Sequence, residues 1–322
     1  MEIFTKSILL VLIVQSTLAI DDFETFKIAF NKSYETIEQE LEAEYNFMKS
    51  LEFVQKTPGT KINAFSDLTE EQFNQKFLSS EDEFEDWQNI LAQNYGFCNV
   101  TETSIFPEID LRKDNVLTPI REQGACGSCW AFSTICTVES NYLTTKQAPL
   151  NKWTLSEQQL VDCASPKGCD GEKPTTGFKY LLEKGVTTGD RYPYVGKVQP
   201  CRPPIGSYYR IRTFCWVYPP DPKKIQILLS NRKAALTTVM KITNYMDFRH
   251  YDGRSVIETE VREGKTLSHA VNIVGYGKFF GKDAWIVRNS WGTSWGDKGY
   301  CYVSMNSQVF RLLELVYSAS VV

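Results

Sequence analysis

The chain has 322 residues, of which 42% are hydrophobic and 23% are charged, and its formal net charge is −4 at pH 7. This length is sufficient for one large hydrophobic core or two smaller ones, and the composition excludes an intrinsically disordered chain. The mild acidity argues against a nucleic-acid partner, because nucleic-acid-binding surfaces are normally basic.

The N-terminus has the features of a cleavable signal peptide over residues 1–19. Lys6 precedes an unbroken apolar run from Ile8 to Val14, and small residues follow up to Ala19. The run is too short to cross a bilayer, which takes roughly 20 residues, and no later segment is long and apolar enough. We therefore expect a secreted protein with no membrane partner. A buried core helix over the apolar run is the alternative.

Residues 20–94 contain no cysteine and carry much of the acidic charge. Thr69 followed by Gln72 resembles a capping box that opens a short helix through Phe73 and Phe77. Apolar spacings of three and four predict a longer amphipathic helix, whose apolar stripe would pack against the rest of the chain: Ile37, Leu41, Tyr45, Met48 and Leu51. We interpret the segment as a pro-region, with an ordinary helical subdomain as the alternative.

The remainder of the chain is predicted to be helical first and β-rich from about residue 205. The helices are expected over residues 129–142 and 156–161, and the strands over 207–216, 270–274 and 284–287. Glycine-containing residues 275–283 should form the hairpin connection between the last two strands. This order predicts an α+β fold of two lobes, with the functional site between them.

Cys126 and Cys129 have a CxxC spacing and follow a glycine-rich approach. A redox dithiol would need a thioredoxin-like strand–helix context, and a zinc site would need a suitable second pair of ligands. The third interpretation places Cys129 in the first turn of a helix, where the helix dipole and unbonded N–H groups stabilise a thiolate. Cys126 would then lie in a disulfide.

A thiolate nucleophile needs a proton carrier, and the chain has two histidines, His250 and His269. His269 begins one predicted strand and Asn289 follows the next, so a hairpin can bring the amide oxygen to the imidazole and fix its tautomer. Trp291 would cover that bond. His250 lies among charged and aromatic residues with no amide partner in view, and we interpret it as structural.

Gln123 lies six residues before Cys129. Its side-chain amide would point at the oxygen on which negative charge develops, with the backbone N–H of Cys129 as second donor. Loss of one such donor typically slows an enzyme about 100- to 1000-fold.

These motifs resemble the signature of the papain and cathepsin L-like cysteine proteases. The matching segments are Gln123…Cys126-Gly127-Ser128-Cys129-Trp130, Ser268-His269-Ala270 and Asn289-Ser290-Trp291-Gly292. Within that family the sequence looks most similar to the mite group 1 allergen proteases, through residues 107–112, 248–253 and 285–291.

The resemblance implies a papain-like fold, with a helical left lobe and a β-barrel-like right lobe. It implies a cysteine endopeptidase made as a zymogen, with an inhibitory pro-region over 20–94 and a peptidase domain over 95–322 that begins near Tyr95. The expected partners are protein or peptide substrates, the chain's own pro-region and cystatin-like inhibitors, and the expected enzyme is a monomer with no cofactor. Its location would be extracellular, by way of an acidic digestive or lysosomal compartment.

The nine cysteines follow the family only in part. The resemblance implies the pairs Cys126–Cys169, Cys163–Cys201 and Cys98–Cys215. Cys136 and Cys301 have no counterpart there, and they are either buried thiols or a fourth disulfide. Candidate glycosylation sites are Asn31 and Asn99, each in a sequon.

Other residues are assigned by the resemblance, with some departures. Substrate-binding positions are Gly171, Glu172, Pro174, Leu267, Ala270, Trp291 and Leu315. Glu172 stands where most relatives have glycine, as an acid does in the mite branch. The pro-region motif is kept as Asn63, Phe65 and Asp67, but Lys61 replaces its leading glycine. At the cation site of mite relatives this chain has Thr154 and Gly189 beside Glu157, so we expect no metal.

Two other classes of function were weighed. A catalytically inactive paralogue, acting as a binder or decoy, would have lost the nucleophile or the base, and both stand here. A transglutaminase-like acyl transferase shares the Cys–His chemistry but not this motif order.

Overall fold

The structure is a computed structural model that describes residues 20–80, 96–101, 105–146, 153–202, 208–243, 245–260, 267–305 and 309–322. The predicted signal peptide and the expected start of the mature chain near Tyr95 lie outside these residues. Among the described helices, none combines the length and apolar character that a membrane span requires.

The helices in chain order are α1 (Phe23–Ala29), α2 (Ile37–Lys56), α3 (Glu70–Phe77), the 3₁₀ helix η2 (Leu111–Lys113), α5 (Cys129–Thr144), α6 (Glu157–Cys163), the 3₁₀ helix η3 (Gly168–Asp170), α7 (Pro174–Glu183), α8 (Pro222–Arg232) and α9 (Tyr245–Arg249). The strands are β1 (Ser79–Ser80), β2 (Ile109–Asp110), β3 (Ile211–Trp216), β4 (Leu236–Ile242), β5 (Val256–Ile257), β6 (Leu267–Phe279), β7 (Lys282–Arg288), β8 (Tyr300–Ser304) and β9 (Tyr317–Val321).

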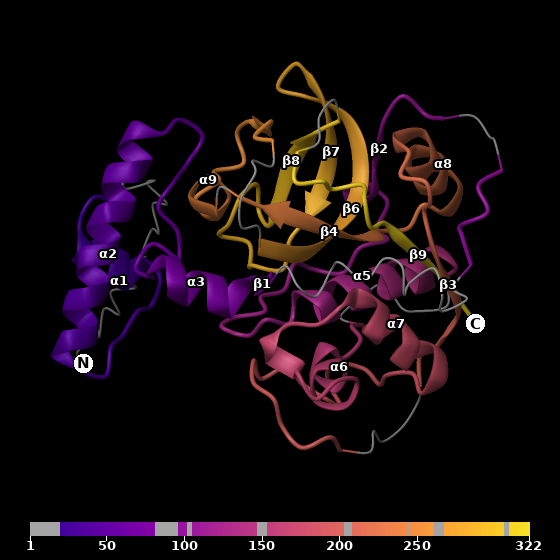
Figure 1. The fold of residues 1–322 in the computed structure, drawn as a ribbon, viewed down its shortest axis with the longest axis horizontal. Helices are drawn as coiled ribbons and strands as arrows, with labels where there is room; N and C mark the ends of the chain where they lie inside the picture. Colours follow the sequence, from indigo (N-terminus) through magenta and orange to yellow (C-terminus); the bar gives the residue numbers. More distant parts are fainter. Residues whose placement is uncertain are drawn as a thin grey trace, which may run out of the picture.

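The predicted α+β architecture is confirmed. Strands pair in the order β3-β9-β4-β6-β7-β8-β5, with β1 and β2 also paired to β6, and helices α5, α6 and α7 form a separate layer below them (Figure 1). Helix α5 is buried along almost its whole length, because it packs on β6 and β9 as well as on α6 and α7. It therefore joins the helical lobe to the β-rich lobe.

The hairpin between β6 and β7 is present, but the predicted connection was partly wrong. Gly275 and Gly277 lie within β6, and the turn is formed by Phe280 and Gly281, both with positive φ. Gly275 is needed for a different reason: β2 pairs alongside it, and a Cβ there would overlap the carbonyl oxygen of Ile109. Helix α8 was also missed within the half predicted to be strands.

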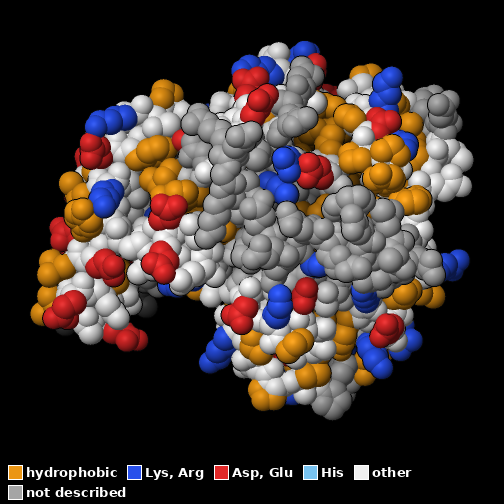
Figure 2. Space-filling model, in the orientation of Figure 1, with side chains coloured by type: hydrophobic (Ala, Val, Ile, Leu, Met, Phe, Trp, Pro, Cys, Tyr) orange, Lys and Arg blue, Asp and Glu red, His pale blue; other side chains and the backbone are white. Residues whose placement is uncertain are grey.

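The capping box of Thr69 and Gln72 is confirmed at the start of α3. The predicted apolar stripe of α2 is mostly exposed: the exposed fractions are Ile37 73%, Leu41 59%, Tyr45 61% and Met48 52%, and of its five members Leu51 packs against the buried cluster of α1 and α2. Figure 2 shows hydrophobic side chains on the surface over α1 and α2. The helix instead buries Phe47 against Phe23 and Phe26 of α1, an element that sequence periodicity did not predict.

The three disulfides implied by the resemblance are formed: Cys98–Cys215, Cys126–Cys169 and Cys163–Cys201. Cys129, Cys136 and Cys301 lie outside any disulfide, and all three are buried. Burial raises the pKa of the Cys136 thiol and that of the Cys301 thiol. Both of these thiols should therefore be unreactive in the folded protein.

Alkylation of the mature enzyme with iodoacetamide tests this arrangement. One label, on Cys129, is expected under native conditions, and two more, on Cys136 and Cys301, are expected in denaturant without reductant. Mass spectrometry counts the labels. A single label under both conditions would show that Cys136 and Cys301 are bonded to each other.

Candidate active site

Cys129 is the first residue of α5, and the loop before it is fixed by contacts with the segment around Cys169. The Cys126–Cys169 disulfide anchors the loop, and the N–H of Gly127 donates to the carbonyl oxygen of Cys169 at 2.7 Å. A Cβ on Gly127 would lie 2.5 Å from that oxygen, so the close approach requires glycine. Cys129 thus begins a helix at a defined point between the two lobes.

The β6–β7 hairpin brings His269 and Asn289 together, as the sequence predicted. The Nε2 atom of His269 lies 2.7 Å from Oδ1 of Asn289, an arrangement in which the imidazole donates to the amide oxygen. The backbone N–H of Ala270, the residue after His269, donates to Sγ of Cys129 at 3.5 Å. A thiol, an imidazole and an amide therefore meet at the junction of α5 and β6.

Gln123 approaches the same junction from the loop before α5. Its backbone N–H donates to the carbonyl oxygen of Ser290 at 2.8 Å, and its side-chain oxygen accepts from the Ser290 hydroxyl at 2.7 Å. Its side-chain nitrogen donates to the carbonyl oxygen of Cys126 at 2.9 Å. An amide nitrogen has two hydrogens, so one of them is engaged in this bond.

Trp291 covers the imidazole. Its ring centroid lies 4.7 Å from that of His269, and the side chain is 1% exposed. Three phenylalanine rings of the predicted pro-region, Phe65, Phe73 and Phe77, contact the same indole at 5.5, 5.3 and 6.1 Å. The segment 20–80 therefore packs directly on the residues around His269.

The segment then crosses the site as an added strand. Strand β1 pairs with the start of β6, placing Ser79 opposite Ser268 and Ser80 opposite Leu267. Burial lowers the pKa of His269 to about 4, against the opposing effects of the Asn289 side chain and the Phe77 backbone. With the segment in place, the imidazole is neutral throughout the physiological pH range.

A second contact between this segment and the main body centres on Arg249 and His250. The guanidinium of Arg249 donates to the carbonyl oxygens of Phe65 and Leu68. The carbonyl oxygen of His250 accepts from the Lys61 backbone N–H at 2.7 Å, and its Nδ1 lies 3.2 Å from the Lys61 carbonyl oxygen. Sequence reasoning interpreted His250 as structural and did not connect it with the pro-region.

Some of the residues predicted to line an apolar substrate pocket lie together beside Cys129. Ala270 and Leu315 pack with Cys129, and Val239 of β4, which sequence reasoning missed, completes the group. Leu267 lines an open cavity between α3 and the main body, and Pro174 begins α7. Val239 could have been found only from the pairing of β4 with β6, which places it opposite Ala270.

Gly171 has a φ of 96°, a value that favours glycine. The neighbouring Glu172 directs its carboxylate to the Ser165 hydroxyl at 2.7 Å and to the Lys173 backbone N–H at 2.8 Å. The acid in place of the second glycine is thus bonded within its own loop.

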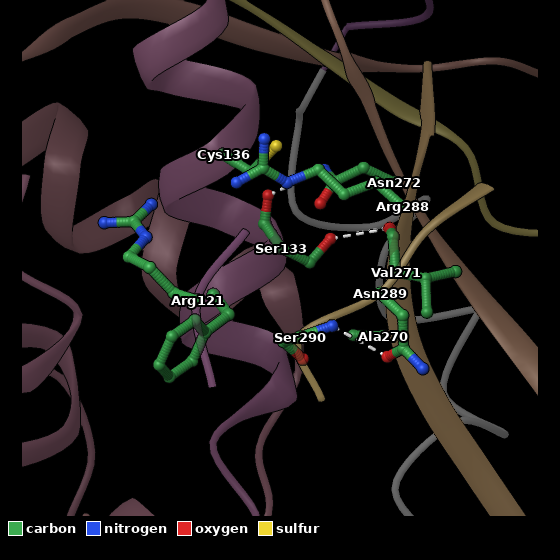
Figure 3. A pocket seen from close by; sticks show the side chains of 10 residues that line it. Arg121, Ser133, Cys136, Ala270, Val271, Asn272, Arg288, Asn289 and Ser290 are labelled. Atoms are coloured by element: carbon green, nitrogen blue, oxygen red, sulfur yellow. Dashed lines mark hydrogen bonds between the residues drawn. The ribbon is translucent and has the colours of Figure 1, made fainter. Parts of the chain in front are cut away.

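Behind the site, a cavity of about 10 Å³ lies between α5 and the β6–β7 hairpin, enough for roughly one water molecule. Figure 3 shows Arg288 beside Cys136 on this cavity, with the guanidinium of Arg121 pointing away from the other labelled side chains. Arg121 forms ion pairs with Glu139 and Glu157, each at 2.6 Å. Glu157 therefore forms an ion pair in this structure. Within the described ranges, no group of three or more His, Cys, Asp or Glu residues could hold a metal ion.

Comparison with known families accounts for this arrangement. A model described as papain family cysteine protease matches residues 105–319, more than half of the chain. The chain belongs to the papain family of cysteine proteases.

Relatives extend the match to the N-terminal segment of this papain-family protease. It is 42% identical to Peptidase 1 of Dermatophagoides farinae over 93% of this chain and 92% of that protein. A structure from a study of the mite allergens Blo t 1 and Der p 1 superposes with a TM-score of 0.81, at 30% identity, over 93% of this chain and 99% of the other. The ragweed pollen cysteine protease Amb a 11 in its proform gives a TM-score of 0.77, at 26% identity, over 92% of each chain. The likeness to the mite group 1 allergen proteases is thus confirmed, and this chain is a protease precursor.

Proposed function

We propose that this precursor yields an active cysteine endopeptidase in which Cys129 is the nucleophile, His269 the base and Asn289 the residue that orients the imidazole. The observation that carries the proposal is the His269–Asn289 hydrogen bond, at 2.7 Å, beside a thiol that accepts from the N–H of Ala270, the residue after His269. A nucleophile beside a base that is itself oriented by a third group is the arrangement expected of covalent catalysis.

The mechanism follows from these positions. His269 takes the proton of the Cys129 thiol, and the resulting thiolate attacks the carbonyl carbon of the scissile peptide bond. The oxyanion is stabilised by the Gln123 side chain and the Cys129 backbone N–H. His269 gives its proton to the leaving amine, which departs as the acyl-enzyme forms. His269 then takes a proton from water, which attacks the thioester and releases the acid and the thiol.

The segment 20–94 is proposed as the inhibitory pro-region. Support comes from strand β1, which pairs across the start of β6, and from the neutral imidazole beneath it. We propose further that residues 1–19 direct secretion through an acidic digestive or lysosomal compartment, that Asn31 and Asn99 are glycosylated on this route, and that the mature chain is a monomer beginning near Tyr95. Cystatin-like proteins are proposed as further inhibitors.

The function is tested by incubating the activated protein with a casein gel, with and without an epoxide inhibitor of cysteine proteases. Clearing that the epoxide blocks is expected. No clearing by a processed, folded protein would favour the alternative of an inactive binder. Clearing that resists the epoxide would contradict the thiol mechanism.

A further inference from the structure

The Tyr194 hydroxyl bridges two residues beside the candidate site. Tyr194 lies in the loop that follows α7, and its O–H donates to the backbone carbonyl oxygen of Gln123 at 2.6 Å. The Ser128 hydroxyl lies 2.7 Å from the same phenol oxygen. A phenol has one proton, and here it goes to the carbonyl, so the serine is the donor in the second bond. Burial raises the pKa of Tyr194, which keeps the phenol protonated.

The Ser128 hydroxyl has an unusual hydrogen-bond partner for an N-cap residue. It is the N-cap residue of α5, where serine usually accepts a hydrogen bond from an N–H of the first turn. Its side chain makes no such bond in this helix. The Ser128 hydroxyl thus does not cap α5 and instead orients Tyr194.

The bond from Tyr194 fixes Gln123 from the helical lobe. On the other side, Ser290 of the β-rich lobe holds the Gln123 backbone N–H at 2.8 Å and its side-chain oxygen at 2.7 Å. The backbone of Gln123 is thus held on its N–H and on its carbonyl by groups from different lobes. The direction of the side-chain amide depends on both.

We propose that Tyr194, oriented by Ser128, is a positioning residue for Gln123 and aims its amide at the oxyanion. The inference rests on the oxyanion role given to Gln123 in the proposed function. In this scheme Tyr194 acts through the Gln123 backbone. Because a misplacement of 1 Å in a positioned group can cost about 100-fold in rate, a modest shift of this backbone has a measurable effect.

The test uses the activated enzyme with Tyr194→Phe, which removes the hydroxyl but keeps the ring contact with Phe132 at 4.8 Å. We expect kcat to fall about tenfold and KM to change less than twofold. A misoriented Gln123 amide weakens stabilisation of the transition state more than it weakens substrate binding. The matched control is Tyr192→Phe in the same loop, whose hydroxyl donates to Asp162 at 2.8 Å. That variant should keep the wild-type kcat.

A double-mutant cycle separates positioning from a general loosening of the loop. In a Gln123→Ala background, Tyr194→Phe should lower kcat by less than twofold, because no amide remains to be aimed. An undiminished tenfold effect in that background, no effect in the wild type, or an equal loss from Tyr192→Phe would overturn the inference. If Gln123→Ala itself kept the wild-type kcat, the oxyanion role in the proposed function would be the part that fails.

Discussion

Replacing Cys129 with alanine is expected to lower peptidase activity to less than about one part in a thousand, which corresponds to roughly 4 kcal/mol of barrier. The reason is that no other described cysteine lies at a helix start beside His269: Cys136 is two turns further along α5 and Cys301 lies in β8. The zymogen carrying Cys129→Ala should be processed by an immobilised protease, so that no active enzyme is carried over. Initial rates on a fluorogenic peptide then give the residual activity.

Cys136→Ala is the matched control. It removes a buried thiol from the same helix and should leave kcat unchanged, with at most a modest loss of stability. His269→Ala should be as damaging as Cys129→Ala, whereas Asn289→Ala should be milder because Asn289 transfers no proton. Residual activity of Cys129→Ala above one part in a thousand, in a preparation free of wild-type enzyme, would show that the nucleophile is wrongly assigned.

The second large effect is expected in the acid release of the pro-region, and it centres on His250. The side chain is fully buried, with the Phe53 ring at 5.9 Å and the Lys61 carbonyl beside Nδ1. Its Nε2 atom has no hydrogen-bond partner among the described atoms. Protonation of that nitrogen would place a buried charge next to Arg249 and near Lys61.

The other charged groups around this contact do not offer His250 a partner. Asp252, Arg254 and Asp297 lie near the Lys61 ammonium, whose nitrogen donates to the Gly296 carbonyl at 2.9 Å. Burial, followed by Arg249, lowers the pKa of His250 to about 3 in the closed zymogen. An exposed histidine has a pKa near 6.5, so opening of the pro-region raises its proton affinity.

The sign of the effect follows from this difference. His250 stays unprotonated in the closed zymogen and is protonated in the open one. The stabilisation of the closed zymogen is therefore complete above about pH 6.5 and decreases as the pH falls towards 3. Linkage then allows up to a tenfold increase in the opening constant per pH unit, and about 50-fold between pH 6.5 and 4.5, because the open-state histidine is already half protonated at pH 6.5.

The measurement compares His250→Asn with the parent zymogen, both in a Cys129→Ala background that prevents self-processing. Asparagine keeps a donor for the Lys61 carbonyl but does not titrate. Traces of active enzyme are added, and the rate of pro-region cleavage reports the open population when opening is fast. The ratio of the cleavage rate of the parent to that of His250→Asn should rise by about 50-fold between pH 6.5 and 4.5.

Taking the ratio at each pH cancels the activity of the added enzyme and the titration of His269, which both chains share. Asp67→Asn serves as a control that removes a pro-region ion pair, with Lys32 at 2.9 Å, and leaves His250 unchanged. A ratio that stays constant with pH would exclude His250 as a proton-sensitive contact.

The features that were predicted correctly depend on residues close together in the sequence. Thr69 and Gln72 form their capping box within one helical turn, and His269 and Asn289 meet because a short hairpin connects their strands. Such features depend on few residues close in the chain, so their patterns can be recognised without knowing the rest of the fold.

What it missed depends on contacts between distant segments. The apolar residues of α2 follow helical spacing, yet the helix packs on α1 through Phe47 and leaves all of the stripe but Leu51 exposed. Val239 reaches the site through strand pairing, and His250 acquires its surroundings from a segment nearly 190 residues earlier. Periodicity reports that a face is apolar but not which neighbour covers it.

The indole of Trp291 has a consequence for how this protease can change over time. It covers the imidazole of His269 and also receives three rings from the pro-region. A substitution of Trp291 that weakens binding of the pro-region also exposes the imidazole to solvent. A variant that is activated prematurely through this residue therefore also loses catalytic activity. Inhibition by the pro-region and catalysis thus both depend on the Trp291 side chain. Substitutions that weaken inhibition without loss of activity are expected at contacts such as Lys61, which catalysis does not use.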